Sequence, residues 1–209
     1  MKIVFATQNP GKIREIREIL GKDGFEVVSI GDLDIRACAE ENGETFSENA
    51  EIKAREIYDK LRFQGSVDDI IVMADDSGFC IDELSGAPGV HSARFMGHDT
   101  SYDIKNAAIL EKMKDVPEER RGAEFVCSIC AILPDGKAVF AEGSLRGRVA
   151  HEIRGKEGFG YDPIFYLPQY GKTTAELGND FKNSVSHRSQ ALHKMEELIR
   201  NMSQEMDRS

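Results

Sequence analysis

The chain has 209 residues, of which 40% are hydrophobic and 31% charged, and its formal net charge at pH 7 is −10. This composition is typical of a globular protein in water, and the length suits one large domain or two lobes that share a core. The acidic balance argues against a nucleic-acid polymer as partner, because such binding depends on Lys and Arg neutralising phosphates. A single nucleotide is not excluded, since a local basic pocket could hold it.

No apolar run approaches the ~20 residues that cross a bilayer, so we expect no membrane partner. The segment 1–6 enters a strand pattern at once and leaves no room for a signal peptide. We therefore expect a cytoplasmic protein. Cys127 and Cys130 form a C-x-x-C inside a predicted strand, where residues three apart point to opposite faces. We expect these to be reduced core thiols rather than metal ligands.

Strand and helix patterns alternate along the chain. We expect strands at 2–6, 25–30, 70–74, 123–133, 138–145 and 163–167, and helices at 11–20, 46–62, 102–114 and 187–202. Thr45 and Glu48 predict a capping box at the start of the second helix, and Ser186 is the expected N-cap of the last. We expect a polar surface loop at 63–69 and a frayed tail after Met202.

The most informative stretch is Asp75-Asp76-Ser77-Gly78, which directly follows the apolar run 70–74. An unpaired buried charge is too costly to leave in a core. We therefore expect both carboxylates at the exit of a strand, facing water, a cation or both. Open α/β sheets bind their ligands at the carboxyl ends of strands. A pair of hard oxygen ligands there suits Mg²⁺, and Mg²⁺ suggests a phosphate substrate.

A second candidate is the turn between the first strand and the first helix. Its residues are Thr7, Gln8, Asn9, Pro10, Gly11 and Lys12. Pro suits an early helical position, and Gly lets the backbone approach a ligand. Free N–H groups and the helix dipole make such a turn an anion site, and Lys12 opposes that dipole, so we expect it to meet an anion. An ordinary strand–helix turn is an equally good interpretation of this segment alone.

Two loop segments add further candidates. Glu40 and Glu41 precede the capping box. They would belong to a functional site only if they reach Asp76 in space; otherwise they are solvated carboxylates. Gly158 and Gly160 flank Phe159, so that its ring can stand free of the backbone and stack on a base. A ring tucked into the core is the alternative.

A cationic group surrounds the predicted start of the last helix. Lys182, His187 and Arg188 lie where positive charge destabilises a helix, which indicates an anionic or carbonyl-rich ligand. Such side chains can donate hydrogen bonds to O6 and N7 of a purine. A solvated charge cluster is the alternative interpretation.

Together these segments closely resemble the inosine triphosphate pyrophosphatase family, whose members hydrolyse the non-standard purine nucleoside triphosphates dITP, ITP and XTP. The resemblance covers the chain from residue 2 to about 200. The matching motifs, in family order, are Thr7-x-Asn9-x-x-Lys12, Glu40-Glu41-x-Gly43-x-Thr45-Phe46-x-Glu48-Asn49-Ala50, Ala74-Asp75-Asp76-Ser77-Gly78, Gly86-x-Pro88-Gly89-Val90-x-Ser92-Ala93-Arg94, Gly158-Phe159-Gly160-Tyr161-Asp162-Pro163 and Ser186-His187-Arg188.

The resemblance implies a single α/β domain over residues 1–209. It would have a long mixed central sheet with helices on both faces, two lobes with the active cleft between them, and a homodimeric assembly. Asp76 would be the catalytic carboxylate and a Mg²⁺ ligand, and Glu40 the second ligand. Lys53 is a further candidate for a phosphate contact. The residues expected to bind substrate are Thr7, Gln8, Asn9, Pro10, Gly11, Lys12, Ser77, Phe159, Gly160, Tyr161, Asp162, Lys182, His187 and Arg188.

The predicted reaction is NTP + H₂O → NMP + pyrophosphate with Mg²⁺ as cofactor, which removes ITP, dITP and XTP from the nucleotide pool. Asp76 would orient and deprotonate the attacking water, and Lys12 would stabilise the departing pyrophosphate. Two alternatives stay open. The chain could be a non-catalytic nucleotide-binding or sensor module, which the intact Asp76 and Glu40 disfavour, or a related hydrolase of other modified triphosphates.

Overall fold

The computed structural model describes residues 2–21, 25–65 and 69–206. The surface loop expected at 63–69 therefore falls partly outside the described residues, as does the end of the tail, at 207–209. No helix within the described ranges is long and apolar enough to cross a membrane.

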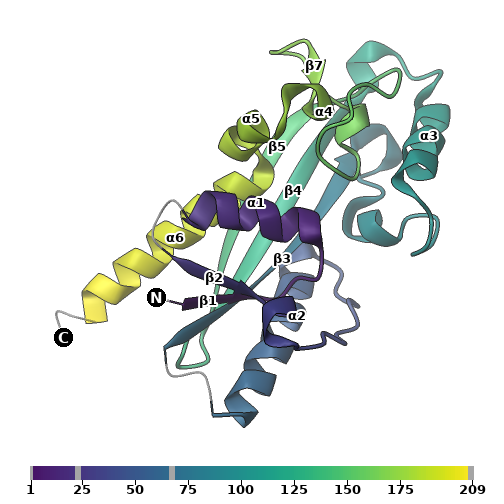
Figure 1. The fold of residues 1–209 in the computed structure, drawn as a ribbon. Coiled ribbons are helices and arrows are strands. Elements are labelled where there is room, and N and C mark those ends of the chain that lie inside the picture. The colour runs from purple at the N-terminus through teal and green to yellow at the C-terminus, as the bar shows by residue number, and fades with distance from the viewer. Residues whose placement is uncertain (1, 22–24, 66–68, 207–209) are drawn as a thin grey trace. The chain divides into compact units, whose positions relative to one another are not determined.

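The strands form one mixed sheet. The seven strands found among the described residues lie in the order β2-β1-β3-β4-β5-β6-β7 (Figure 1). β1 pairs in parallel with both β2 and β3, whereas β6 pairs antiparallel with β5 and β7. Their bounds are β1 Lys2–Phe5, β2 Glu26–Ser29, β3 Ile70–Ile81, β4 Gly122–Ile132, β5 Ala138–Val149, β6 Phe165–Leu167 and β7 Lys172–Thr173. The expectation of a mixed α/β fold is confirmed.

The helices expected from periodicity are present, with ends that differ from the expected ones by at most four residues. The last helix continues to Met206, so the expectation of a frayed tail after Met202 is wrong for residues 203–206. The α-helices are α1 Pro10–Leu20, α2 Phe46–Phe63, α3 Tyr102–Met113, α4 Thr174–Leu177, α5 Asn179–Val185 and α6 His187–Met206. Short 3₁₀ helices lie at Gly31–Leu33, Asp82–Leu84, Gly89–Arg94, Glu118–Arg120 and Asp162–Ile164. The short helices α4 and α5 and the strand β7 were not predicted.

Local capping explains where two of the helices begin. The hydroxyl of Thr45 accepts from the backbone N–H of Glu48, and the Glu48 carboxylate accepts from the backbone N–H of Thr45, which confirms the capping box of α2. In α1, Pro10 occupies the first helical turn and the Asn9 side chain is the N-cap. The two helices thus begin where the sequence predicts.

The chain divides into two compact units, and β3, β4 and β5 each contribute to both. Unit 1 comprises residues 1–76, 127–143 and 188–209, and unit 2 comprises 77–126 and 144–187. The division agrees with the two lobes that the resemblance implies, whereas a cleft between them stays a prediction.

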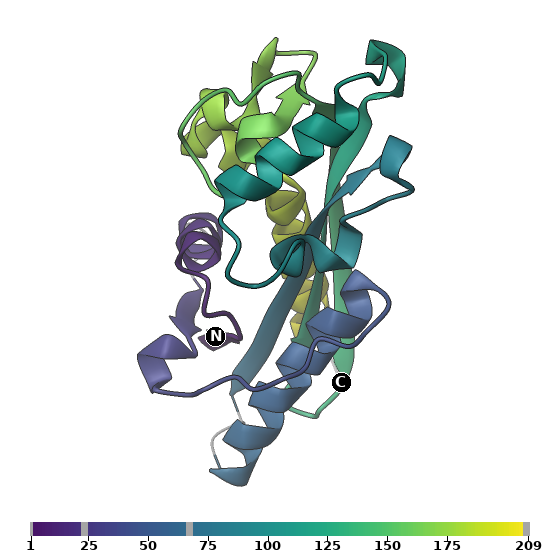
Figure 2. The ribbon, with the colours of Figure 1, turned by 90° about the vertical axis from the view of Figure 1, so that its right-hand side faces the viewer.

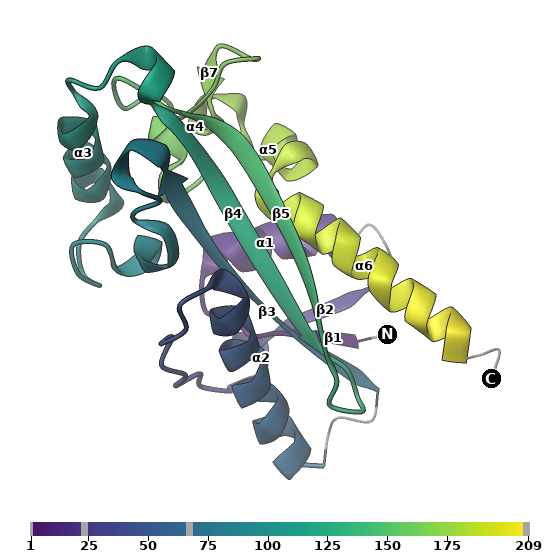
Figure 3. The ribbon, with the colours of Figure 1, turned by 180° about the vertical axis from the view of Figure 1, so that it is seen from behind.

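Inside unit 1 the sheet has a core on each face. Along β3, Ile71 and Met73 pack in the core that includes α1 and α6 residues, whereas Val72 and Ala74 pack in the core that includes α2 residues. In Figure 3, α2 lies in front of β3, and Figure 2 shows α1 nearly end-on at the other side of that strand. Successive residues of β3 in unit 1 therefore alternate between the core that includes α1 and α6 and the core that includes α2.

The two neighbouring cysteines follow the same alternation. Cys127 belongs to the core on the α1 and α6 side, and Cys130 to the core on the α2 side. Neither forms a disulfide among the described residues, and burial raises the pKa of Cys130 to about 12. The expectation that the pair occupies opposite faces is confirmed.

One boundary differs in a way that matters for the site. The predicted strand 70–74 was expected to end before Asp75, but β3 continues to Ile81. Asp75 and Asp76 are consequently buried inside a strand, and are 2% and 6% exposed. The expectation that the pair sits at a strand exit is wrong, whereas the expected cationic partners are present: Lys12 lies beside Asp75 and Lys53 beside Asp76, and these charges permit burial.

Candidate active site

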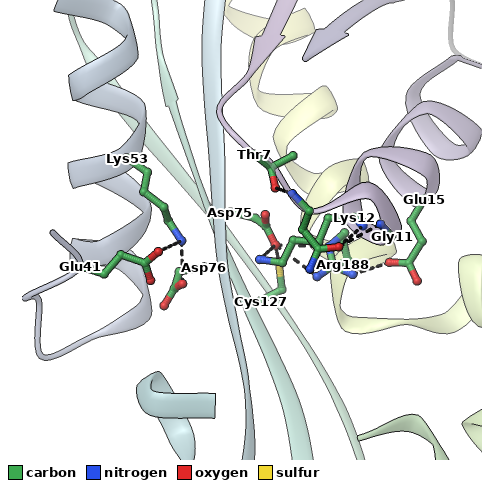
Figure 4. Close-up of polar contacts among 11 residues, drawn as sticks. Thr7, Gly11, Lys12, Glu15, Glu41, Lys53, Asp75, Asp76, Cys127 and Arg188 are labelled. Atoms are coloured by element: carbon green, nitrogen blue, oxygen red, sulfur yellow. Dashed lines mark hydrogen bonds and ion pairs between the residues drawn. The ribbon is translucent and has the colours of Figure 1, made fainter. Parts of the chain in front are cut away.

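The two adjacent aspartates of β3 face opposite sides of the sheet. Figure 4 shows Asp75 directed toward Lys12 and Arg188, and Asp76 directed toward Lys53 on α2. This is the geometry of any strand, in which neighbouring side chains alternate. The pair therefore cannot act as two ligands of one ion, and each carboxylate has its own environment.

Asp75 is the centre of a buried ion-pair network. Its Oδ2 lies 2.9 Å from Lys12 Nζ and 3.2 Å from Arg188 Nη2, and Arg188 also pairs with the buried carboxylate of Glu15 on α1. Burial alone would raise the pKa of Asp75, but the charges of Lys12, Arg188 and Lys53 outweigh it and hold that pKa far below its usual range. Asp75 therefore remains ionised.

Arg188 is a buried side chain of α6 rather than a surface donor. Only 1% of the residue is exposed. Burial alone would lower the pKa of its guanidinium, but Asp75 and Glu15 outweigh that effect and raise it. Arg188 was predicted to bind substrate; the structure places it against Asp75 and Glu15 and shows that it links α6 to β3 and α1.

Asp76 has the opposite electrostatic balance. Its Oδ1 accepts a hydrogen bond of 2.7 Å from Lys53 Nζ, and its Oδ2 is buried with no hydrogen-bond partner among the described residues. Burial raises the pKa of Asp76 despite the charges of Lys53 and Lys12. Neighbouring carboxylates whose pKa values are pushed apart are a pattern of acid–base sites, and here Asp76 is the one suited to accept a proton.

Lys53 bridges Asp76 and Glu41. Its ammonium lies 2.7 Å from Asp76 Oδ1 and 3.6 Å from Glu41 Oε1. Burial would lower the pKa of Lys53, but Asp76, Asp75 and Glu41 together raise it. Glu40, which was predicted as the second metal ligand, is exposed, whereas Glu41 is half-buried beside Lys53. The structure therefore favours Glu41 over Glu40 as the loop carboxylate of this site.

The donor set around Asp76 fits Mg²⁺. Asp76 and Glu41 already share one cationic group, and Asp76 Oδ2 is a buried oxygen without a hydrogen-bond partner among the described residues. Within those residues no group of three or more His, Cys, Asp or Glu side chains could hold a metal. Two carboxylates suffice for Mg²⁺, which usually completes its coordination with water and substrate phosphate oxygens.

The turn at 7–12 is organised differently from the expected anion site. The side-chain oxygen of Asn9 accepts hydrogen bonds from the backbone N–H groups of Gly11 and Lys12 at 2.9 and 3.2 Å. The backbone N–H of Asn9 donates to the hydroxyl of Thr7 at 3.2 Å. The expectation of free N–H groups is therefore wrong for Gly11 and Lys12. The Lys12 ammonium meets an anion, as expected, in the carboxylate of Asp75, whereas its contact with a phosphate stays a prediction; Gln8 and Pro10 are exposed.

The remaining predicted residues belong to unit 2. Lys182 Nζ pairs with Asp162 Oδ2 at 2.7 Å and lies 4.4 Å from the centroid of the Phe159 ring, so the loop 158–162 and α5 do meet. The buried His187 ring stacks on Phe125 with centroids 4.9 Å apart.

Three other predicted residues in unit 2 are Tyr161, Gly160 and Ser77. The buried Tyr161 donates its hydroxyl to the carbonyl of Ser92 at 2.8 Å, and burial raises its pKa. Gly160 and Ser77 are half-buried. Tyr161 is thus a core residue whose hydroxyl is engaged. Whether Ser77 and Gly160 contact a substrate stays a prediction.

Comparison with known proteins identifies the family of this chain. The sequence profile of the Ham1 family matches residues 3–198. The chain belongs to the Ham1 family. It is 44% identical over 199 residues to a protein of Exiguobacterium sibiricum named dITP/XTP pyrophosphatase, covering 95% of this chain and 97% of the relative. A Clostridium perfringens protein of the same name is 42% identical over the same shares. The structure of the Staphylococcus aureus Ham1 protein superposes with a TM-score of 0.82 at 34% identity, covering 97% of this chain and 100% of that one.

Sequence reasoning missed Glu15, which the structure pairs with Arg188. It named Asp75 and Glu41, but it took Asp75 as a ligand beside Asp76 and assigned the loop ligand to Glu40. A signal for Glu15 was available, because it lies three residues after Lys12 and such residues share a helix face. The role of Asp75 could also have been questioned from strand alternation alone.

Replacement of Asp75 by Asn should destabilise the fold by about 3–5 kcal/mol, because it leaves Lys12 without its buried counter-charge and Arg188 with Glu15 alone. The pKa of Asp75 is lowered in the folded state. Its contribution is therefore present above the unfolded pKa of about 3.9 and is lost as the pH falls below it. Urea unfolding without divalent cations should show a difference from wild type that is largest near neutral pH and shrinks below about pH 4.

Asp82→Asn is the matched control, since it removes an exposed aspartate paired with Arg146 and should cost less than about 1 kcal/mol. A difference between wild type and Asp75→Asn that stays constant down to acid pH would contradict the assignment.

Proposed function

We propose that this chain hydrolyses ITP, dITP and XTP to the nucleoside monophosphate and pyrophosphate, with Mg²⁺ as cofactor. The names of its Exiguobacterium and Clostridium relatives support the substrate class. The observation that carries the chemistry is the buried Asp76 carboxylate, which has one oxygen on Lys53 and the other without a hydrogen-bond partner among the described residues. A homodimer, supported by the resemblance alone, and a cytoplasmic location are part of this proposal.

Asp76 would act as the general base. Lys53 fixes one oxygen of its carboxylate at 2.7 Å, and a raised pKa brings the group closer to the value at which a base works well near neutral pH. Asp76 would accept a proton from a water molecule as the water oxygen bonds to the α-phosphorus. The bond from that phosphorus to the oxygen leading to the β-phosphate breaks, and its electron pair leaves with pyrophosphate.

The neighbouring lysines would neutralise the phosphates. Lys12 and Lys53 project from α1 and α2, and both charges act on Asp76. Fixed cations at a departing polyphosphate stabilise charge that develops in the transition state. Asp76 and Glu41 would hold Mg²⁺, which when bound supplies further charge neutralisation on phosphate oxygens.

Base selection would fall to the loop 158–162 and α5. The Phe159 ring offers a stacking surface, and the Lys182 ammonium above it is a donor. Inosine and xanthine present O6 as an acceptor, whereas adenine presents an amino group at that position. A site that donates to O6 therefore rejects adenine, because its donor would face another donor.

A nucleotide panel tests the proposal directly. The protein is incubated with ITP, XTP, ATP and dTTP in the presence of Mg²⁺, and pyrophosphate release is measured. We expect turnover of ITP and XTP well above ATP and dTTP. Binding of ITP without turnover would indicate the sensor alternative, and preferential turnover of dTTP would indicate a hydrolase of other triphosphates.

Asp76→Asn should lower kcat for ITP by about 10²–10⁴-fold, since removal of a general base costs this much, while nucleotide affinity changes by less than about tenfold. Steady-state kinetics measure kcat for ITP, and calorimetric titration with ITP measures the affinity. Because the pKa of Asp76 is raised by burial and Lys53 keeps Glu41 as a counter-charge, the variant should lose less stability than Asp75→Asn. Full activity of Asp76→Asn would refute its role.

Glu41→Gln and Glu40→Gln separate the two loop carboxylates. Only Glu41 lies beside the Lys53–Asp76 pair. Loss of a ligand charge weakens a cation site, so Glu41→Gln should raise the Mg²⁺ concentration for half-maximal activity by about tenfold or more. Glu40→Gln should leave it near the wild-type value. The reverse order would restore Glu40 as the ligand.

A further inference from the structure

The Asp162 carboxylate is completely engaged inside unit 2. The residue is 1% exposed. Its Oδ2 accepts from the backbone N–H of Phe159 at 2.8 Å and from Lys182 Nζ at 2.7 Å, and its Oδ1 accepts from the hydroxyl of Thr174 at 2.9 Å. Both oxygens are therefore used by the protein itself.

The two groups that share Asp162 Oδ2 also face one another. Lys182 Nζ lies 4.4 Å from the centroid of the Phe159 ring, a favourable distance for a cation over an aromatic face. A lysine side chain has four flexible carbons and loses rotamer entropy when its ammonium is held in one place. The ion pair to Asp162 fixes where that ammonium sits relative to the ring.

The loop backbone is adapted to this carboxylate. Gly158 has φ +78°, and a Cβ built there would lie 2.2 Å from Asp162 Oδ2. A residue with a side chain at position 158 would have to displace the Asp162 carboxylate. Thr174 adds a second constraint from α4, because its hydroxyl contacts both the carboxylate and the carbonyl of Asp162.

We propose that Asp162, braced by Thr174, is a positioning residue that sets the placement of Lys182 over Phe159 and thereby the preference for purines with an oxo group at C6. The inference rests on the proposed function and deepens it. It gives Asp162 a role other than direct contact with the substrate, since both of its carboxylate oxygens accept hydrogen bonds from the protein itself, from Phe159, Lys182 and Thr174. Lys182 and Phe159 are the groups that would meet the base.

An activity-independent measurement tests the geometry. In protein with ¹³C-labelled lysine, the side-chain methylene protons of Lys182 should be shifted upfield by the Phe159 ring, and the signal is assigned by its loss in Lys182→Arg. Asp162→Asn should move this signal to the ordinary lysine position, because the ion pair that holds the ammonium is gone. Thr174→Val, which keeps the buried ion pair, should fold normally and shift the signal part of the way.

Kinetics test the link to selectivity. The ratio of kcat/KM for ITP to that for ATP should fall by about tenfold or more in Asp162→Asn, because a misplaced donor no longer discriminates O6 from an amino group. Thr174→Val should lower the ratio less. Gly158→Ala should lower it as well, whereas Gly171→Ala should not, since Gly171 also has a positive φ of +63° but only an ordinary contact at its Cβ position.

The outcomes separate the two proposals. If wild-type protein does not turn over ITP, the proposed function fails, while the lysine signal still reports on the geometry. If wild type discriminates ITP from ATP but Asp162→Asn and Thr174→Val both retain the upfield lysine signal and the ratio, the positioning role is overturned. A shifted signal with an unchanged ratio also overturns it, because placement would then not govern selectivity.

Discussion

The period of two along β3 is the constraint on which the site depends. It sends the side chains of two consecutive aspartates to opposite faces of the sheet, where different helices supply the cations. On one face, Lys12 and Arg188 keep Asp75 ionised. On the other, a single lysine leaves Asp76 dominated by burial, and its pKa rises. One dipeptide thus supplies a structural anion and a candidate base.

Stability alone is a poor explanation for so many buried charges. Removing an ion pair from water costs free energy that the attraction barely offsets, and apolar residues of similar volume often serve a fold equally well. Unit 1 nevertheless buries Glu15, Asp75 and Arg188 almost completely. The gain is positional, since the network ties α1 and α6 to β3 and fixes where the ammonium of Lys12 lies. Such pre-organisation is what electrostatic catalysis requires.

A buried aspartate that orients a lysine recurs in the molecule. The Asp75–Lys12 and Asp76–Lys53 pairs in unit 1 have separations of 2.9 and 2.7 Å, and the Asp162 carboxylate holds a third lysine, in unit 2, at 2.7 Å. Lysine is a flexible cation, and a fixed carboxylate limits the positions that it occupies. In unit 1 this device presents charge to phosphates in our proposal, and in unit 2 it presents a donor to the base.

The sequence by itself determined the elements whose signals are local. Helical periodicity, the capping box at Thr45 and strand alternation at Cys127 and Cys130 depend only on neighbouring residues, and the structure confirms them. The motifs also identified the family. Only the tertiary structure decided that β3 continues through Asp75 and Asp76, because the charge that permits burial comes from Arg188, 113 positions away. It likewise favoured Glu41 over Glu40, because only the folded chain shows which loop carboxylate lies beside Lys53 on α2. A hydrophobic pattern carries no information about contacts between charged side chains of different segments.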